Sequence, residues 1–96
     1  MRRMVIILIK ISVIIPVFNL AKVIEKTLDS VCNQCYKNFE IIIIDDESTD
    51  NSIEIIQKYF INKDVNYKLI KQKNKGVSAA RNRGIKEAKG DYIFFL

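Results

Sequence analysis

Residues 41–48 read IIIIDDES, a run of four isoleucines that ends on two aspartates and a glutamate. A short, unbroken run of β-branched residues favours a strand buried on both faces, because apolar and polar side chains do not alternate along it. Asp45, Asp46 and Glu47 then form an acidic cluster where this strand ends. The stretch therefore predicts a buried strand with carboxylates at its carboxyl end.

Similar apolar runs recur along the chain, and segments with the three- and four-residue spacing of a helix face separate them. We expect strands at residues 11–15, 40–44, 67–70 and 91–96, and helices at residues 20–34, 52–60 and 77–89. This order predicts a truncated β-α-β-α-β-α-β unit of the α/β class, with a doubly wound, mainly parallel sheet. Ligands of such sheets bind beyond the carboxyl ends of the strands, which selects residues 16–19, 45–50 and 71–76.

Three polar or small residues are expected to shape the helix ends. Asn19 is a candidate cap for the first helix, and Asp50 is a candidate N-cap for the second, because their side chains can accept hydrogen bonds from the free amides of a first turn. Gly90 is expected to supply the left-handed residue that ends the third helix.

The length of 96 residues and the hydrophobic content of 49% suit one small domain. Residues 1–9 are interpreted as an N-terminal extension or an extra edge strand, and residues 10–96 as the domain itself. Lys10 interrupts the first apolar run far short of the roughly 20 residues that cross a membrane, so we expect a cytoplasmic protein. Whether Arg2 and Arg3 bring it to the cytoplasmic face of a membrane stays open.

Composition argues against several other functions. The net charge of +5 is spread among acidic residues and gives a mild preference for anionic ligands, without the basic, aromatic-rich stripe of a nucleic-acid binder. Cys32 and Cys35 form a C-x-x-C pair, but the chain has no histidine and no second pair to complete a zinc site. A redox pair belongs at a helix start, whereas this one falls late in a predicted helix. We interpret both cysteines as reduced side chains.

The paired carboxylates also suggest a remote alternative, a receiver domain of two-component signalling that binds magnesium beside a phosphorylated aspartate. Such a domain needs its phosphoacceptor at the carboxyl end of a later strand. Asp64 lies before a predicted strand and Asp91 lies at the start of one, so neither stands where the acceptor should be. The first strand and helix would also be left unexplained.

Four motifs occur in one order along the chain: ISVIIPVFN at 11–19, SVCNQCYKNFEIIIIDDESTDNS at 30–52, NKGVSAARNRG at 74–84 and GDYIFFL at 90–96. Together they resemble the start of the family 2 glycosyltransferases, enzymes of the Rossmann-like GT-A fold that move a sugar from a nucleotide diphosphate donor. The resemblance covers residues 10–96. It implies the N-terminal, nucleotide-sugar-binding half of a GT-A domain, with a role in polysaccharide biosynthesis.

The resemblance also implies roles for single residues. Pro16, Val17 and Phe18 match the turn that borders the uracil and ribose, and Phe18 offers a flat ring to a base or sugar. Asp46 matches the position that accepts a hydrogen bond from the base, for which an ionised carboxylate is suited. Arg81 matches the family arginine near the base and diphosphate, where its planar fork of donors suits oxygen atoms.

Two neighbours of Asp46 are interpreted differently. Asp45 is expected to bond nearby backbone amides and to be structural. Glu47 stands where most members of the family have glycine, so a positive φ at this position would strain the loop.

In the family, the last strand of this sequence leads into a D-x-D motif that holds Mn²⁺ or Mg²⁺ against the donor diphosphate. We expect these ligands, and the acidic catalytic base, beyond Leu96, so residues 1–96 hold no catalytic or metal-binding residue and are inactive alone. The full-length reaction is expected to be direct displacement by an acceptor hydroxyl of a glycan or lipid-linked glycan. The alternative is a non-catalytic nucleotide-binding module, truncated or completed by a partner chain.

Overall fold

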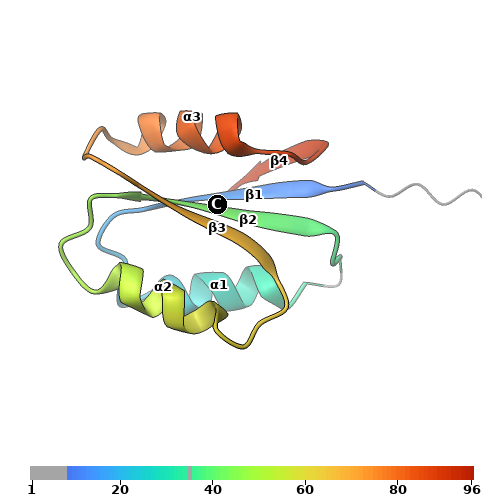
Figure 1. Ribbon diagram of the computed structural model, residues 1–96, viewed down its shortest axis with the longest axis horizontal. Helices are drawn as coiled ribbons and strands as arrows, with labels where there is room; N and C mark the ends of the chain where they lie inside the picture. Colours follow the sequence, from blue (N-terminus) through green and yellow to red (C-terminus); the bar gives the residue numbers. More distant parts are fainter. Residues whose placement is uncertain (1–8, 35) are drawn as a thin grey trace, which may run out of the picture.

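The computed structural model describes residues 9–34 and 36–96. Its elements are β1 (Ile11–Val17), α1 (Ile24–Cys32), β2 (Phe39–Asp46), α2 (Ser52–Phe60), β3 (Asn66–Gln72), α3 (Val77–Glu87) and β4 (Tyr92–Phe95). The four strands form one parallel sheet in the order β3-β2-β1-β4. Figure 1 shows α1 and α2 on one face of this sheet and α3 on the other. The predicted doubly wound α/β fold is confirmed.

The predicted elements differ from the observed ones mainly at their ends. α1 begins at Ile24, not at residue 20, because residues 20–23 form a preceding turn in which the Ile24 amide donates to the Leu20 carbonyl at 2.9 Å. β2 continues through both aspartates, and α3 ends at Glu87, not at residue 89. Within the described residues, no helix is long and apolar enough to cross a membrane.

The described residues include only part of the segment predicted as residues 1–9 and only one cysteine of the pair. Residues 1–8 and Cys35 lie outside the described residues, and Ile9 is not in a strand. Cys32 is the last residue of α1 and has a free thiol, in line with the late position expected for it.

The run of four isoleucines in β2 is explained by the two faces of the sheet. Successive side chains of a strand point to opposite faces, so a central strand covered on both sides needs apolar residues at every position. Ile41 and Ile43 belong to the cluster beneath α1 and α2, whereas Ile42 and Ile44 pack with Ala80 of α3. All four isoleucines have an exposed fraction of 0%. The run therefore supplies the centre of two separate cores.

The order of the strands reverses at β1. The chain moves from β1 to β2 and β3 in one direction, and α3 then carries it back so that β4 pairs with the other side of β1. The α3 crossover lies against β1 and β2 on the face opposite to α1 and α2 (Figure 1). In open parallel sheets, the crevice beyond the carboxyl ends at such a reversal is the usual place for a ligand.

A buried polar network closes the opposite, amino-terminal edge of the sheet. The Ser12 hydroxyl donates to Glu40 Oε2 at 2.6 Å, and the amides of Lys89 and Gly90 donate to Glu40 Oε2 and Ser12 Oγ at 2.7 and 2.8 Å. Burial alone would raise the pKa of Glu40, but these hydrogen bonds from Ser12 and Lys89, helped by Lys10, hold it below its ordinary value of 4.5. Its contribution to stability is therefore present above pH 4.5 and lost as the pH falls through the lowered pKa.

This network also corrects the prediction for Gly90. Among the described glycines only Gly76 has a positive φ, so Gly90 is not the expected left-handed residue. A Cβ at Gly90 would lie 2.6 Å from Ser12 Oγ, 2.7 Å from Ser12 N and 2.9 Å from the Lys10 carbonyl oxygen. Glycine is needed here because the backbone between α3 and β4 passes directly against β1.

We predict that Gly90→Ala lowers the free energy of unfolding by about 2 kcal/mol, since an added Cβ must displace backbone atoms of β1. Gly90→Asn should be at least as destabilising. Asparagine tolerates a left-handed backbone but not a close approach, so it separates the two explanations. Urea denaturation of the three chains measures the effect, and stability equal to wild type for Gly90→Asn would contradict the packing argument.

Candidate functional site

The β1–α1 loop, the end of β2 and the start of α3 meet at the carboxyl edge of the sheet. Between them is a cavity of about 140 Å³ lined by Pro16, Val17, Phe18, Leu20, Asp46, Val77 and Ala80. Four of the five residues predicted to bind a nucleotide thus line one cavity beside the strand-order reversal. Leu20, Val77 and Ala80 were not singled out by the sequence, because a lining role for small or apolar side chains depends on the packing of α3.

The pleat of β2 gives the two aspartates different surroundings. Asp46 has the same parity as Ile42 and Ile44, so its side chain lies on the α3 face, where it lines the cavity and is 6% exposed. Asp45 lies on the opposite face, where its carboxylate accepts hydrogen bonds from the amide and hydroxyl of Ser48 at 3.0 and 2.6 Å. The structural role expected for Asp45 is confirmed.

Asp46 accepts three hydrogen bonds from the chain itself. Gln72 Nε2 and the Lys75 amide donate to its Oδ1 at 3.0 and 2.8 Å, and the Gly76 amide donates to its Oδ2 at 3.0 Å. The bonds from Gln72 and Lys75 hold the pKa of Asp46 below its ordinary value, so the group is ionised at neutral pH. An ionised carboxylate has about four acceptor positions. One position, on Oδ2, is left for a ligand.

The link between Asp46 and the start of α3 was not foreseen from the sequence. Gly76 is the residue that directly precedes this helix. Its φ of 91° and ψ of 168° lie in a region that is essentially restricted to glycine. In this conformation the Gly76 amide donates a hydrogen bond to Asp46. The anion beside the start of α3 is therefore the carboxylate of Asp46 from β2.

Glu47 has the strained backbone that the sequence comparison with glycine-containing relatives suggested. Its φ is 61°, in the left-handed region that a residue with a Cβ adopts at a cost. Its carboxylate accepts a hydrogen bond from the Asn74 amide at 3.3 Å, which ties the β2–α2 loop to the β3–α3 loop.

Asn19 joins two loops and does not cap α1 as predicted. Its φ is 51°, and its Oδ1 accepts hydrogen bonds from the amides of Thr49 and Asp50 at 2.7 and 3.2 Å. Its own amide donates to Ser48 Oγ at 2.9 Å. These contacts fix the β1–α1 loop, which carries Phe18, against the loop that follows β2.

Asp50 binds the first turn of α2, although it is not the N-cap. The N-cap position is Asn51, and it makes no side-chain capping bond. Asp50 Oδ1 accepts from the amide and hydroxyl of Ser52 at 3.0 and 2.5 Å, while its Oδ2 accepts from the Ala21 amide at 3.1 Å. The predicted N-cap position is therefore wrong by one residue. Asp50 lies one position before the N-cap, where it binds both the first turn of α2 and the β1–α1 loop.

Phe18 and Arg81 are both exposed, but only Phe18 lines the cavity. The Phe18 ring lines it and is 46% exposed, so a flat apolar face is available at the entrance. Arg81 follows the buried Ala80 on α3 and is not among the lining residues. The structure thus does not bring Arg81 to the cavity that holds Asp46.

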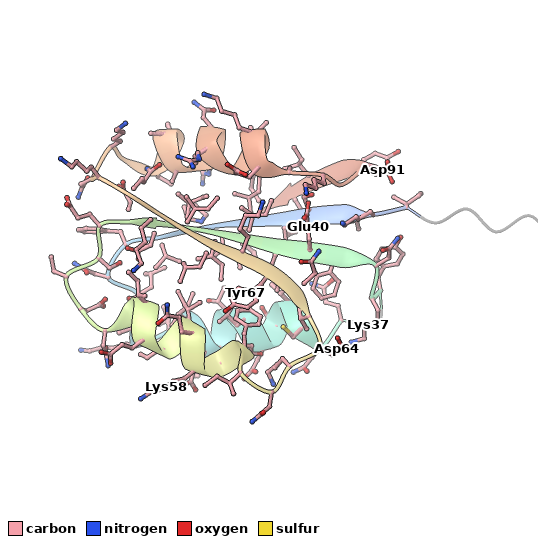
Figure 2. The ribbon with its side chains drawn as sticks, viewed as in Figure 1. Lys37, Glu40, Lys58, Asp64, Tyr67 and Asp91 are labelled. Atoms are coloured by element: carbon pink, nitrogen blue, oxygen red, sulfur yellow. The ribbon has the colours of Figure 1, made fainter. Side chains whose placement is uncertain are left out.

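The described residues do not provide a metal site or a receiver-type site. Residues 9–34 and 36–96 include no group of three or more His, Cys, Asp or Glu side chains that could hold a metal ion. Figure 2 shows Asp64 and Asp91 at the amino-terminal edge of the sheet, far from the end of β2. The receiver alternative is excluded for this part of the chain, because neither aspartate can act beside Asp45 and Asp46.

A parallel sheet that reverses order at β1, with a carboxylate in the cavity at its carboxyl edge, is the arrangement of a doubly wound, nucleotide-binding α/β domain. Residues 12–96 match the family model described as glycosyl transferase family 2. The chain belongs to this family.

Relatives with known names support the assignment. The chain is 46% identical over 87 residues to glycosyltransferase GlyA of Streptococcus pneumoniae, covering 91% of this chain and 12% of that protein. It is 45% identical over 86 residues to the cholesterol galactosyltransferase of Borreliella burgdorferi, covering 90% of this chain and 24% of that protein. The chain therefore spans a quarter or less of each of these relatives.

Solved structures of similar proteins support the same assignment to a glycosyltransferase family. S. aureus TarS 1–349 in complex with UDP-GlcNAc superposes with a TM-score of 0.83 and 35% identity, over 91% of this chain and 26% of that chain. The mannosyltransferase PcManGT from Pyrobaculum calidifontis, in complex with GDP-Man and Mn²⁺, has a TM-score of 0.82 and 26% identity, over 86% of this chain and 25% of that chain. The neighbours are GT-A glycosyltransferases, as the sequence predicted.

We predict that Glu47→Gly is more stable than Glu47→Ala by about 1 kcal/mol. Both variants lose the bond to Asn74, but only alanine keeps a Cβ in the left-handed region, and the conformational entropy of glycine offsets part of that difference. Urea denaturation of the matched pair measures it. If the alanine variant were equally stable, the backbone at residue 47 would not be strained.

Proposed function

We propose that this chain is the nucleotide-binding part of a glycosyltransferase that moves a sugar from a uridine diphosphate donor to an acceptor hydroxyl. The observation that carries the proposal is the cavity where the ionised Asp46 and the exposed ring of Phe18 meet. Membership of glycosyl transferase family 2 supports it, as do the TarS complexes with UDP and with UDP-GlcNAc. Pro16 and Val17 complete the nucleotide pocket.

Each of these residues has a physical role in holding a uridine. The Phe18 ring offers one face for stacking, and Asp46 accepts a hydrogen bond from the base. Arg81 is exposed on α3 near the cavity lined by its neighbour Ala80, and we assign it to the negatively charged diphosphate outside that cavity.

The hydrogen bonds of Asp46 favour uracil over guanine. Uracil presents a single N–H donor between two carbonyl groups, whereas guanine presents two adjacent donors that suit both oxygens of one carboxylate. Gln72 and the Lys75 amide fill Oδ1, and only one position on Oδ2 is left. A base with a single donor satisfies this carboxylate, while guanine would keep one donor without a partner at a cost.

The transfer itself needs groups that the described residues do not supply. A divalent ion, Mn²⁺ or Mg²⁺, offsets the charge that grows on a departing diphosphate, and the PcManGT complex contains Mn²⁺. We place its ligands, the catalytic base and the acceptor glycan or lipid-linked glycan outside this chain. We also propose that the protein is located in the cytoplasm.

The second candidate is a non-catalytic nucleotide-binding module that a partner chain completes. The exposed apolar side chains of β4 favour it: Tyr92, Ile93, Phe94 and Phe95 are 63%, 40%, 56% and 42% exposed. An edge strand of this kind tends to pair with another strand. Both candidates require nucleotide binding, and sugar transfer by the full-length protein distinguishes them.

We predict that the chain binds UDP and that Phe18→Ala weakens binding about ten-fold, since stacking on an aromatic ring contributes about 1–3 kcal/mol per base. Asp46→Ala should weaken it at least as much. Isothermal titration calorimetry measures the dissociation constants, with circular dichroism as the check that each variant folds.

Val23→Ala and Glu54→Ala are matched controls for this titration. Val23 is another exposed apolar residue near α1, and Glu54 is an exposed carboxylate in the first turn of α2, but neither lines the cavity. Both should bind UDP like wild type. Equal affinity for UDP in the wild type and in Asp46→Ala would count against the proposed site.

We also predict that wild type prefers UDP to GDP by at least about ten-fold, the value of one hydrogen bond to a charged group. Gln72→Met should reduce this preference several-fold, because it frees a position on Oδ1 of Asp46. Gln57→Met, an exposed position on α2, is the control. An unchanged preference in Gln72→Met would refute the role of Gln72 while leaving UDP binding intact.

A further inference from the structure

The charged residues are distributed unequally over the two faces of the sheet. On the α3 face, five exposed cations surround one partly exposed acid, Glu87, and we call these cations the basic surface: Lys68, Lys75, Arg83, Lys86 and Lys89. The other acids of this face, Glu40 and Asp46, are buried and hydrogen-bonded. The helices of the other face, α1 and α2, carry two lysines, Lys26 and Lys58, against three acids, Glu25, Asp29 and Glu54. The linear sequence hides this asymmetry, because acids elsewhere in the chain cancel the charge in a simple count.

Glu87 neutralises little of the basic surface. Its carboxylate is paired with Lys68 Nζ at 3.4 Å and with Arg83 Nε at 3.4 Å. The pKa of Glu87 is lowered by the hydrogen bond from Lys68, so the acid stays ionised at neutral pH. Within residues 9–34 and 36–96, ion pairs closer than 4.0 Å involve only these three side chains, and Lys86 and Lys89 remain available to an external anion.

The basic surface is convex, and this shape fits a broad, flat partner better than a single narrow strand. α3 packs on the sheet through Ala80 and Gly84, so its other side is the convex surface of a helix. Figure 2 shows nitrogen-tipped side chains around α3 and the turn before it, pointing away from the sheet. A single-stranded polyanion is normally held in a groove with aromatic rings, and α3 contains no aromatic residue.

An apolar side chain also lies within the basic surface. Ile85 is 44% exposed and directly precedes Lys86 on α3. Cations beside an exposed apolar residue match the interface of an anionic bilayer, which attracts the charges and accepts the apolar group among its headgroups.

We propose that the basic surface docks this domain on an anionic phospholipid bilayer. The carboxyl edge of the sheet, with the Asp46 cavity, lies at the side of this surface and remains open to a soluble ligand. Docking would hold the cavity beside the bilayer, within reach of an acceptor that is anchored in the lipid. The inference depends on charge and shape alone and does not require the proposed nucleotide binding.

Sedimentation of the chain with vesicles tests the proposal. Binding is expected to vesicles of 70% phosphatidylcholine and 30% phosphatidylglycerol, to be weak with phosphatidylcholine alone, and to fall as salt shortens the screening length. Lys86→Gln with Lys89→Gln should reduce the partition coefficient about twenty-five-fold, since each cation near an anionic surface strengthens binding about five-fold. Neither side chain belongs to the proposed nucleotide pocket.

Lys26→Gln with Lys58→Gln is the matched control, because it removes the same charge from the opposite face; Figure 2 shows Lys58 pointing away from the sheet there. This variant should bind the vesicles like wild type. Equal weakening by both pairs would show that net charge, not this surface, drives binding. Failure to bind phosphatidylglycerol vesicles, or binding only to soluble polyphosphate, would also overturn the proposal.

Discussion

The two-residue period of β2 is the constraint on which the rest of the domain depends. This strand lies between two neighbours and beneath helices on both faces, so its four isoleucines are divided between two cores. A slip of one residue would exchange the faces of every side chain. Since burying one isoleucine contributes about 1.5–3 kcal/mol, the four together fix the register strongly. The same register sends Asp45 to the loop before α2 and Asp46 to the cavity beneath α3.

The site is therefore an outcome of core packing as much as of its polar residues. Asp46 lies at a strand end that cannot move without disturbing Ile42 and Ile44, and donors from the end of β3 and from the β3–α3 loop surround it. Asn19 anchors the loop that carries Phe18 on the opposite side of the cavity. A ligand would meet a carboxylate and a ring that are already held in place, which limits the entropy lost on binding.

Sequence patterns predicted the features that depend on neighbours in the chain. The isoleucine run, the helix at residues 52–60 and the bonding of Asp45 to a nearby amide are local, and the structure has them. The errors at Asn19 and Gly90 share a cause, because in both cases a distant segment determines the role. The donors of Asp46 and the basic surface were missed for the same reason, since both arise only when α3 crosses over the sheet.

The two ends of α3 are held by two acids of one strand. Glu40 accepts from Lys89 just beyond the helix, Asp46 accepts from Gly76 just before it, and both lie on the same face of β2. Six residues of strand span about 20 Å, close to the roughly 16 Å of an eleven-residue helix. The spacing of Glu40 and Asp46 along β2 thus matches the length of α3. An insertion or deletion within α3 would move one of these two contacts out of place, since each residue changes the length of the helix by about 1.5 Å.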